Sequence, residues 1–185
     1  MFNKTQTILV QCPGGIAGNY GVPEGTSSIG LGAFEYCTSL RSVVIPASVI
    51  SVDDGAFFGC SILTAVYFSG SAPSPGSNVF FDANQATVYY LPGTAGWGST
   101  FGGRPTALWN PQVRTGDTRF GVRQNRFGFN VTGTPGIPLV VETCTDLAAQ
   151  SWVPLQSCTL TNGLIYFSDP QWTNYPERFY RLRSP

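Results

Sequence analysis

Apolar residues recur along the first half of the chain at a fixed interval of 23 residues. The longest column of this repeat is Val22, Ile45, Phe68 and Leu91, and a second column consists of Phe34, Phe57 and Phe80. Further columns keep the same register: Ala33, Ala56 and Val79; Leu40 and Leu63; Cys37 and Cys60; and Val43, Val66 and Tyr89. A repeat of this length is typical of a leucine-rich-repeat solenoid, whose coils stack on one another.

Each repeat is expected to contribute one short strand. The segments 43–45, 66–68 and 89–91 are rich in β-formers, and a proline follows at Pro46 and Pro92, where it ends the ladder. We predict that these segments form adjacent parallel strands of one sheet, with the phenylalanine column stacked beneath them. The predicted repeat core consists of Phe34, Phe57, Phe80, Leu40, Leu63, Ile45, Phe68 and Leu91.

Two complete units of the repeat carry a recognisable motif. The segments SSIGLGAFEYCTSLRSVVIPASV and ISVDDGAFFGCSILTAVYFSG resemble the bacterial surface-antigen class of leucine-rich repeats called BspA-like, over about residues 20–92. The third unit departs from the motif, with Ala83 in the cysteine position and Ala86 in the leucine position, and is therefore expected to be a terminal, capping unit. The resemblance implies a surface-exposed, non-catalytic protein that binds other proteins or host and matrix components.

Both ends of so short a solenoid must be covered, because an open coil exposes an apolar face. Residues 5–21 are predicted to form the N-terminal cap. After the last coil, an aromatic cluster of Trp97, Phe101 and Trp109 is interpreted either as the C-terminal cap or as a platform for sugar binding. The need to cover the last coil favours the cap.

The repeat ends after Pro111, and the rest of the chain has a different pattern. Short apolar runs alternate with turn sequences such as Thr-Gly-Thr-Pro-Gly and Thr-Asn-Gly, which is typical of an antiparallel sandwich. The predicted fold is therefore mainly β: a solenoid with its caps over residues 1–110, then a small immunoglobulin-like or fibronectin-like β-sandwich over residues 111–185. The segment VVETCTDLAAQSWVPLQ and the C-terminal YFSDPQWTNYPERFYRLRSP also resemble a module that follows such repeats in secreted, Verrucomicrobia-like proteins of environmental bacteria, which implies a structural or surface-associated appendage.

The five cysteines fall into two groups. Cys37 and Cys60 occupy one column of the repeat and are interpreted as buried free thiols rather than reactive ones. Cys144 and Cys158 lie on strands expected to be neighbours, so they are a disulfide candidate if the protein is exported; the alternative is two unpaired thiols.

The charge balance argues against recruitment of nucleic acid or a membrane surface, and no apolar stretch reaches transmembrane length, so membrane insertion is not expected. Only 11% of the residues are charged and the net charge is zero. Eight of the nine arginines nevertheless lie from Arg104 onward, and four of them fall between Arg114 and Arg126, countered only by Asp117. A solvated strand face or an inter-domain seam is favoured over a polyanion site, because such sites need a larger basic excess.

The inventory of side chains excludes most catalytic chemistry. The chain has no histidine, and its one lysine, Lys4, lies near the terminus. No four cysteines have metal-ligand spacing and no calcium-loop motif occurs, so no catalytic residue, metal site or cofactor is predicted. A carboxylate pair, which would need tertiary proximity, is the remaining route to hydrolysis.

Two functions of different kinds remain. The first is a non-catalytic module that binds a protein or a glycan through the strand face of the solenoid or its aromatic rim. The second is a structural subunit whose copies assemble into an extracellular filament or surface layer. The scarcity of lysine and the abundance of Gly, Ser, Thr and aromatic residues indicate an extracellular or cell-surface protein. The chain has no recognisable signal peptide, so we expect a mature form or a fragment.

Overall fold

Short β-strands form nearly all of the regular structure. A computed structural model describes residues 1–13, 15–149 and 151–184, and the chain divides into two units, Met1–Leu108 and Trp109–Pro185. Within the described residues the helical element is one 3-10 turn, η1 (Trp172–Asn174). The predicted mainly β fold is confirmed.

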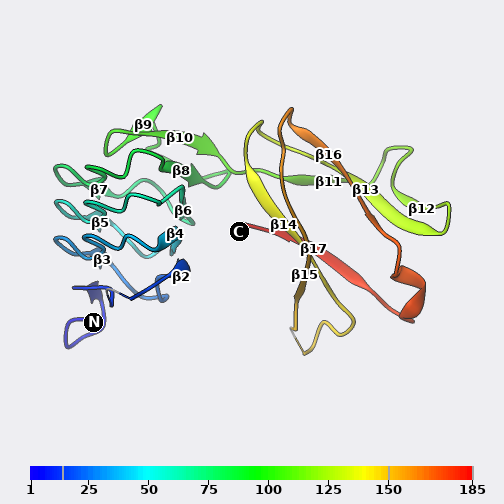
Figure 1. Cartoon of the computed structure of the whole chain (residues 1–185), viewed down its shortest axis with the longest axis horizontal. Helices are drawn as coiled ribbons and strands as arrows, with labels where there is room; N and C mark the ends of the chain where they lie inside the picture. Colours follow the sequence, from blue (N-terminus) through cyan, green and yellow to red (C-terminus); the bar gives the residue numbers. More distant parts are fainter. Residues whose placement is uncertain (14, 150, 185) are drawn as a thin grey trace. The chain divides into compact units, whose positions relative to one another are not determined.

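The first unit is a solenoid in which each coil gives one strand to each of two parallel sheets (Figure 1). The first sheet has the order β1 (Ile8–Leu9), β3 (Ser28–Ile29), β5 (Ser51–Val52) and β7 (Ser74–Pro75). The second has the order β2 (Gly18–Gly21), β4 (Leu40–Ile45), β6 (Ala65–Phe68), β8 (Thr87–Tyr90), β10 (Arg104–Leu108) and β9 (Thr100–Phe101). All neighbouring strands of both sheets are parallel except β9 and β10. The predicted parallel stacking of the three strands is confirmed, but the third strand ends at Tyr90 and pairs one residue earlier than predicted.

The phenylalanine column runs through the interior of this stack. The rings of Phe34 and Phe57 lie 4.8 Å apart at 6° to each other, and those of Phe57 and Phe80 lie 5.1 Å apart at 8°. Leu40 and Leu63 are also fully buried. Because each ring packs between the rings of adjacent coils, the interior of every coil is completed by its neighbours.

The third coil is one residue shorter than the repeat predicts. Phe68 pairs with Tyr90, not with Leu91, although Val43 and Val66 pair at the full interval. Two residues separate Leu63 from Val66 in the second coil, but only Thr87 separates the corresponding Ala86 and Val88. The prediction that Leu91 belongs to the repeat core is therefore wrong: it follows β8 and is only half-buried, and Tyr90 takes its place in the ladder.

Both ends of the solenoid are covered by local chain. At the N-terminal end, Phe2 forms an antiparallel bridge with Leu9, and Leu9 and Cys12 are buried in the core. Gly14, in the predicted cap, lies outside the described residues. At the other end, the β9–β10 hairpin adds β10 to β8 and places Phe101 in the core, 5.3 Å from Phe68.

The second unit consists of two antiparallel sheets. In the first, β13 (Arg126–Thr132) pairs with β11 (Gln112–Arg114), β12 (Gly121–Arg123) and β16 (Leu164–Asp169). In the second, β14 (Pro138–Cys144) lies between β15 (Val153–Thr159) and β17 (Phe179–Arg183). Tyr180 of β17 lies 5.9 Å from both Phe129 and Phe167 of the other sheet, so aromatic side chains join the two layers. These antiparallel strands are compatible with the small β-sandwich that the sequence predicts.

Truncation of the phenylalanine column should destabilise the solenoid unequally. Phe57→Ala removes a ring that packs between two others, and we expect a loss of about 3–5 kcal/mol in the free energy of unfolding. Phe80→Ala should cost less, because beyond Phe80 the capping residue Phe101 packs more loosely, at 6.5 Å. Urea denaturation of both variants tests this order. If both variants lose the same free energy of unfolding, the cap stabilises Phe80 as much as another coil would.

Candidate functional site

Three aromatic side chains form an exposed row across the turns of the solenoid. Tyr36 packs edge-on against Phe58 at 5.5 Å, and Phe58 stacks on Phe81 at 5.0 Å. Tyr36 is 62% exposed, Phe81 is 52% exposed and Phe58 is half-buried. We call these three residues the aromatic ridge. It lies on the turns that lead from the first sheet into the second, and it places aromatic surface of three successive coils side by side.

The repeat itself creates this ridge. In the pairs Phe57–Phe58 and Phe80–Phe81, the first ring enters the core column and the second remains outside. The next position has a positive φ in each coil: 53° at Tyr36, 69° at Gly59 and 57° at Asp82. A Cβ atom at Gly59 would lie 2.5 Å from the ring of Tyr36, so glycine is required there for Tyr36 to reach across to the neighbouring coil.

An acidic hollow adjoins the ridge. It has a volume of about 400 Å³, shares Phe58 with the ridge, and is lined by Leu31, Glu35, Asp54 and other turn residues. Leu31 is 74% exposed, and the Asp54 Oδ1 accepts a hydrogen bond of 2.7 Å from the Ser77 amide. Glu35 and Asp54 are both solvent-exposed. A general acid at neutral pH needs burial or a like-charged neighbour in a closed site, so this hollow suits recognition better than proton transfer.

The predicted aromatic cluster is divided between the two units. Trp97 lies 5.1 Å from Phe68 and stacks on Tyr90 at 5.3 Å, and Phe101 is buried beside it, so both cover the last coil. Trp109 belongs to the second unit, where its Nε1 donates a 2.8 Å hydrogen bond to the Pro138 carbonyl. Trp97 and Phe101 therefore form the C-terminal cap that the sequence favours. The aromatic ridge was not predicted from the repeat pattern, although the doubled phenylalanines at 57–58 and 80–81 are a signal for it, since only one ring of each pair can face the core.

The predicted disulfide between Cys144 and Cys158 is not formed. The two residues lie on neighbouring strands, as expected, but Cys158 pairs with Leu139, five residues before Cys144 on β14. At about 3.3 Å per strand residue this offset is about 16 Å, far beyond the Cα separation of about 7 Å that a disulfide spans. All five cysteines are free.

Cys37 and Cys60 are buried, as the repeat predicts, and Cys12 is buried as well. Burial raises the pKa of the Cys12 thiol to about 11 and that of the Cys60 thiol to about 12. The Cys60 thiol donates a hydrogen bond of 3.0 Å to the Phe34 carbonyl. These thiols stay protonated near neutral pH, so they fill the coils and are poor nucleophiles.

The buried carboxylates of the second unit are held in ion pairs. Glu142 contacts Arg181 at 2.7 Å and Arg183 at 2.5 Å. Asp169 contacts Arg178 at 2.7 Å and accepts a 2.9 Å hydrogen bond from the Tyr180 hydroxyl. Across the described ranges, no three Cys, Asp or Glu side chains gather in a way that could hold a metal ion. The two buried carboxylates are thus used to join β17 to its neighbours.

The Glu142 ion pairs should make the second unit sensitive to acid. Burial opposes the charged form, but hydrogen bonds from Arg183 and Arg181 outweigh it and hold the pKa of Glu142 below its ordinary value of 4.5. On acidification the unfolded chain therefore binds a proton first, so this contribution to stability is complete above pH 4.5 and is lost as the pH falls below it.

In Glu142→Gln, we expect a lower stability at pH 7 and a weaker dependence of the urea midpoint on pH between pH 7 and pH 3. Glu177→Gln, which changes an exposed carboxylate outside these ion pairs, is the matched control. An unchanged pH dependence in Glu142→Gln would show that these ion pairs do not couple folding to protonation.

The comparisons with known proteins bear on the solenoid. No curated protein and no solved structure matches the chain. Residues 18–95 match the family described as BspA type Leucine rich repeat region (6 copies), a span that contains β2 to β8 and the whole aromatic ridge. The solenoid of this protein is therefore similar to the BspA-type leucine-rich repeats, as its motif indicated.

Proposed function

We propose that the protein is a non-catalytic, extracellular or cell-surface module that binds another protein through the aromatic ridge and the adjacent acidic hollow. The observation that carries this proposal is the continuous row of exposed rings Tyr36, Phe58 and Phe81. Aromatic side chains are enriched at the energetic centres of protein interfaces, and a contiguous exposed apolar patch marks such a surface. The similarity to BspA-type repeats supports the same class of function.

The arrangement of the rings favours a protein partner over a neutral glycan. Sugars stack on free ring faces, but Phe58 and Phe81 stack on each other, and Tyr36 packs edge-on against Phe58. The ridge therefore offers mainly ring edges and one outer face. Glu35 and Asp54 border it, so the complementary surface is an apolar side chain flanked by lysine or arginine.

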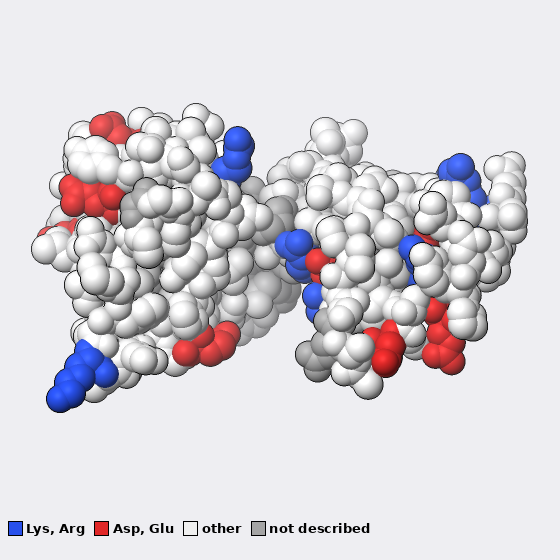
Figure 2. All heavy atoms as spheres, turned by 60° about the horizontal axis from the view of Figure 1, so that its bottom comes forward, with Lys and Arg blue, Asp and Glu red and all other residues white. Residues whose placement is uncertain are grey.

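The proposed surface location is consistent with the composition of the molecule. Most of the face seen in Figure 2 is uncharged, and its acidic and basic side chains form small, separate groups. Within the described ranges, no helix is long and apolar enough to cross a membrane.

A second candidate is a structural subunit that self-assembles. The observation in its favour is the edge strand β2, whose one pairing among the described strands is with β4. An unpaired strand edge can accept a strand from another molecule. At the N-terminal end of the solenoid, the edge of the first sheet is partly paired, because Phe2 forms an antiparallel bridge with Leu9 of β1.

A displayed library of folded protein domains, selected on the immobilised chain, tests the binding proposal. Domains selected with the wild-type protein should lose about tenfold or more in affinity for Phe81→Ser, as expected for an interface centre. Leu147→Ser is the matched control, because Leu147 is 53% exposed and lies outside the solenoid. Binders with apolar residues next to lysine or arginine are expected.

Equal affinity for wild type and Phe81→Ser, with Leu147→Ser also unchanged, would exclude the ridge as the binding surface. Light scattering after size-exclusion chromatography separates the two candidates: a species near 19.9 kDa supports the binding module, and a large species that dissociates when β2 is altered supports assembly.

A further inference from the structure

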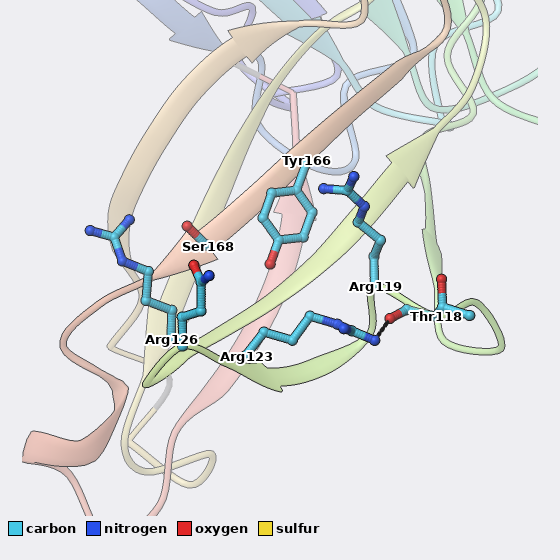
Figure 3. A pocket seen from close by; sticks show the side chains of 7 residues that line it. Thr118, Arg119, Arg123, Arg126, Tyr166 and Ser168 are labelled. Carbon is cyan, nitrogen blue, oxygen red and sulfur yellow. Dashed lines mark hydrogen bonds between the residues drawn. The ribbon is translucent and has the colours of Figure 1, made fainter.

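A second, chemically different hollow lies on the first sheet of the second unit. It has a volume of about 480 Å³ and is lined by residues of the β12–β13 hairpin, of the segment before it and of β16 (Figure 3). The lining residues are Thr118, Arg119, Arg123, Gln124, Arg126, Tyr166 and Ser168. The proposed function of the solenoid makes no use of this hollow.

Strand pairing brings these side chains together. Arg123 pairs with Arg126 across the hairpin, and on the other side of β13 Gly128 pairs with Ser168 and Asn130 with Tyr166. Alternate residues of a strand share a face, so these positions line one face of the sheet.

Gly128 makes room for the floor of the hollow. A Cβ atom there would lie 2.3 Å from the Tyr166 hydroxyl oxygen and 2.7 Å from the Phe167 carbonyl oxygen. The absence of a side chain thus lets the Tyr166 ring lie over β13. The Arg119 guanidinium lies over that ring, 5.3 Å from its centre.

The segment that carries Arg119 is tied to the same face. The Asn130 amide donates a 2.9 Å hydrogen bond to Asp117 Oδ2, and the other oxygen of Asp117 accepts a 2.8 Å bond from the Arg119 backbone amide. The Arg123 guanidinium bonds to the Thr118 carbonyl, as Figure 3 shows. Both arginine side chains are therefore oriented before any ligand binds.

The positive charge of the hollow is not neutralised by its own walls. Arg178, Arg181 and Arg183 form the ion pairs seen in the described part of the chain, and they use the buried carboxylates. Arg119, Arg123 and Arg126 have no such partner in that part, and no carboxylate is among the residues that line the hollow. Three arginines around one cavity match the oxygens of a carboxylate or a sulfate group.

The turn of the hairpin is not optimised for stability. Gln124 and Asn125 have φ angles of 49° and 58°, the conformation of a two-residue type I′ turn, which asparagine and glycine adopt at lower cost than glutamine. Gln124 lines the hollow and adds an amide donor to it. A residue that is unfavourable for the turn but faces the cavity is expected at a binding site.

We propose that this hollow binds an acidic oligosaccharide, whose carboxylate or sulfate groups contact Arg119, Arg123 and Arg126. The hydroxyls of Thr118 and Ser168 and the amide of Gln124 are available for sugar hydroxyls, and the volume is in the range of small-molecule sites. A nucleic-acid backbone fits less well, because the chain has zero net charge and three arginines neutralise too few phosphates for useful affinity at physiological salt.

Calorimetric titration of the full chain with three probes tests the proposal: a chondroitin sulfate hexasaccharide, a hexagalacturonate and an uncharged maltohexaose. One or both acidic probes should bind, more weakly at higher salt, and maltohexaose should not. Chondroitin sulfate carries both carboxylate and sulfate groups, so binding of hexagalacturonate would show that carboxylates are sufficient, and loss of binding after desulfation of the chondroitin probe would identify sulfate as the recognised group. Arg126→Gln should weaken binding about tenfold or more.

Arg114→Gln is the matched control, because it removes the same charge from the same arginine-rich stretch but from β11, outside the hollow. Its affinity should stay within about twofold of wild type. Gln124→Gly should raise the melting temperature through the turn and still weaken binding, which separates a lost ligand contact from misfolding. Phe81→Ser should bind the acidic probes normally, so the result does not depend on the function of the ridge.

Three results would overturn the proposal. The first is no binding of either acidic probe. The second is equal weakening by Arg114→Gln and Arg126→Gln, which would indicate a diffuse charge effect. The third is tighter binding of a single-stranded DNA oligonucleotide than of both acidic saccharides, which would identify a different class of ligand.

Discussion

The solenoid depends on one constraint: no coil can bury its own apolar side. The rings of Phe34, Phe57 and Phe80 meet this constraint by stacking face to face across three coils. Each ring packs against the core of the coils next to it, so removal of one ring exposes the ring of the adjacent coil. Everything else in this unit follows from the register that the column imposes, including the parallel pairing of both sheets and the need for the Trp97–Phe101 cap.

The same register builds the surface. Coils that stack at a fixed interval also align their outer positions, so the second aromatic residue after Phe57 and after Phe80 forms a row on the surface of the solenoid. Phe58 and Phe81 stack at almost the same spacing as the core rings beneath them. Tyr36 joins this row because Gly59 leaves space for its ring. A repetitive scaffold thus converts a repeated core into a repeated row of exposed aromatic side chains.

The second unit is organised by charge as much as by its aromatic core. The buried carboxylates Glu142 and Asp169 recruit the C-terminal arginines of β17 and its preceding turn. The arginines around the β12–β13 hairpin form none of these ion pairs among the described residues, and they line a hollow instead. Arginines of similar sequence context therefore have two different roles, and the position of a carboxylate decides which role each one has.

The repeat interval and its aromatic columns determined the solenoid, its parallel strands and its buried cysteines, because residues buried in every coil recur at a fixed interval in the sequence. Three features depended on backbone pairing that the order of residues does not reveal. The short third coil moved Leu91 out of the core, and the register of β14 with β15 separated Cys144 from Cys158. The arginine hollow was the third: its arginines were visible as a cluster in the sequence, but only the pairing of β13 with β16 placed Tyr166 and Ser168 beside them. Long-range strand register is set by the total packing of both sheets, and no local pattern carries it.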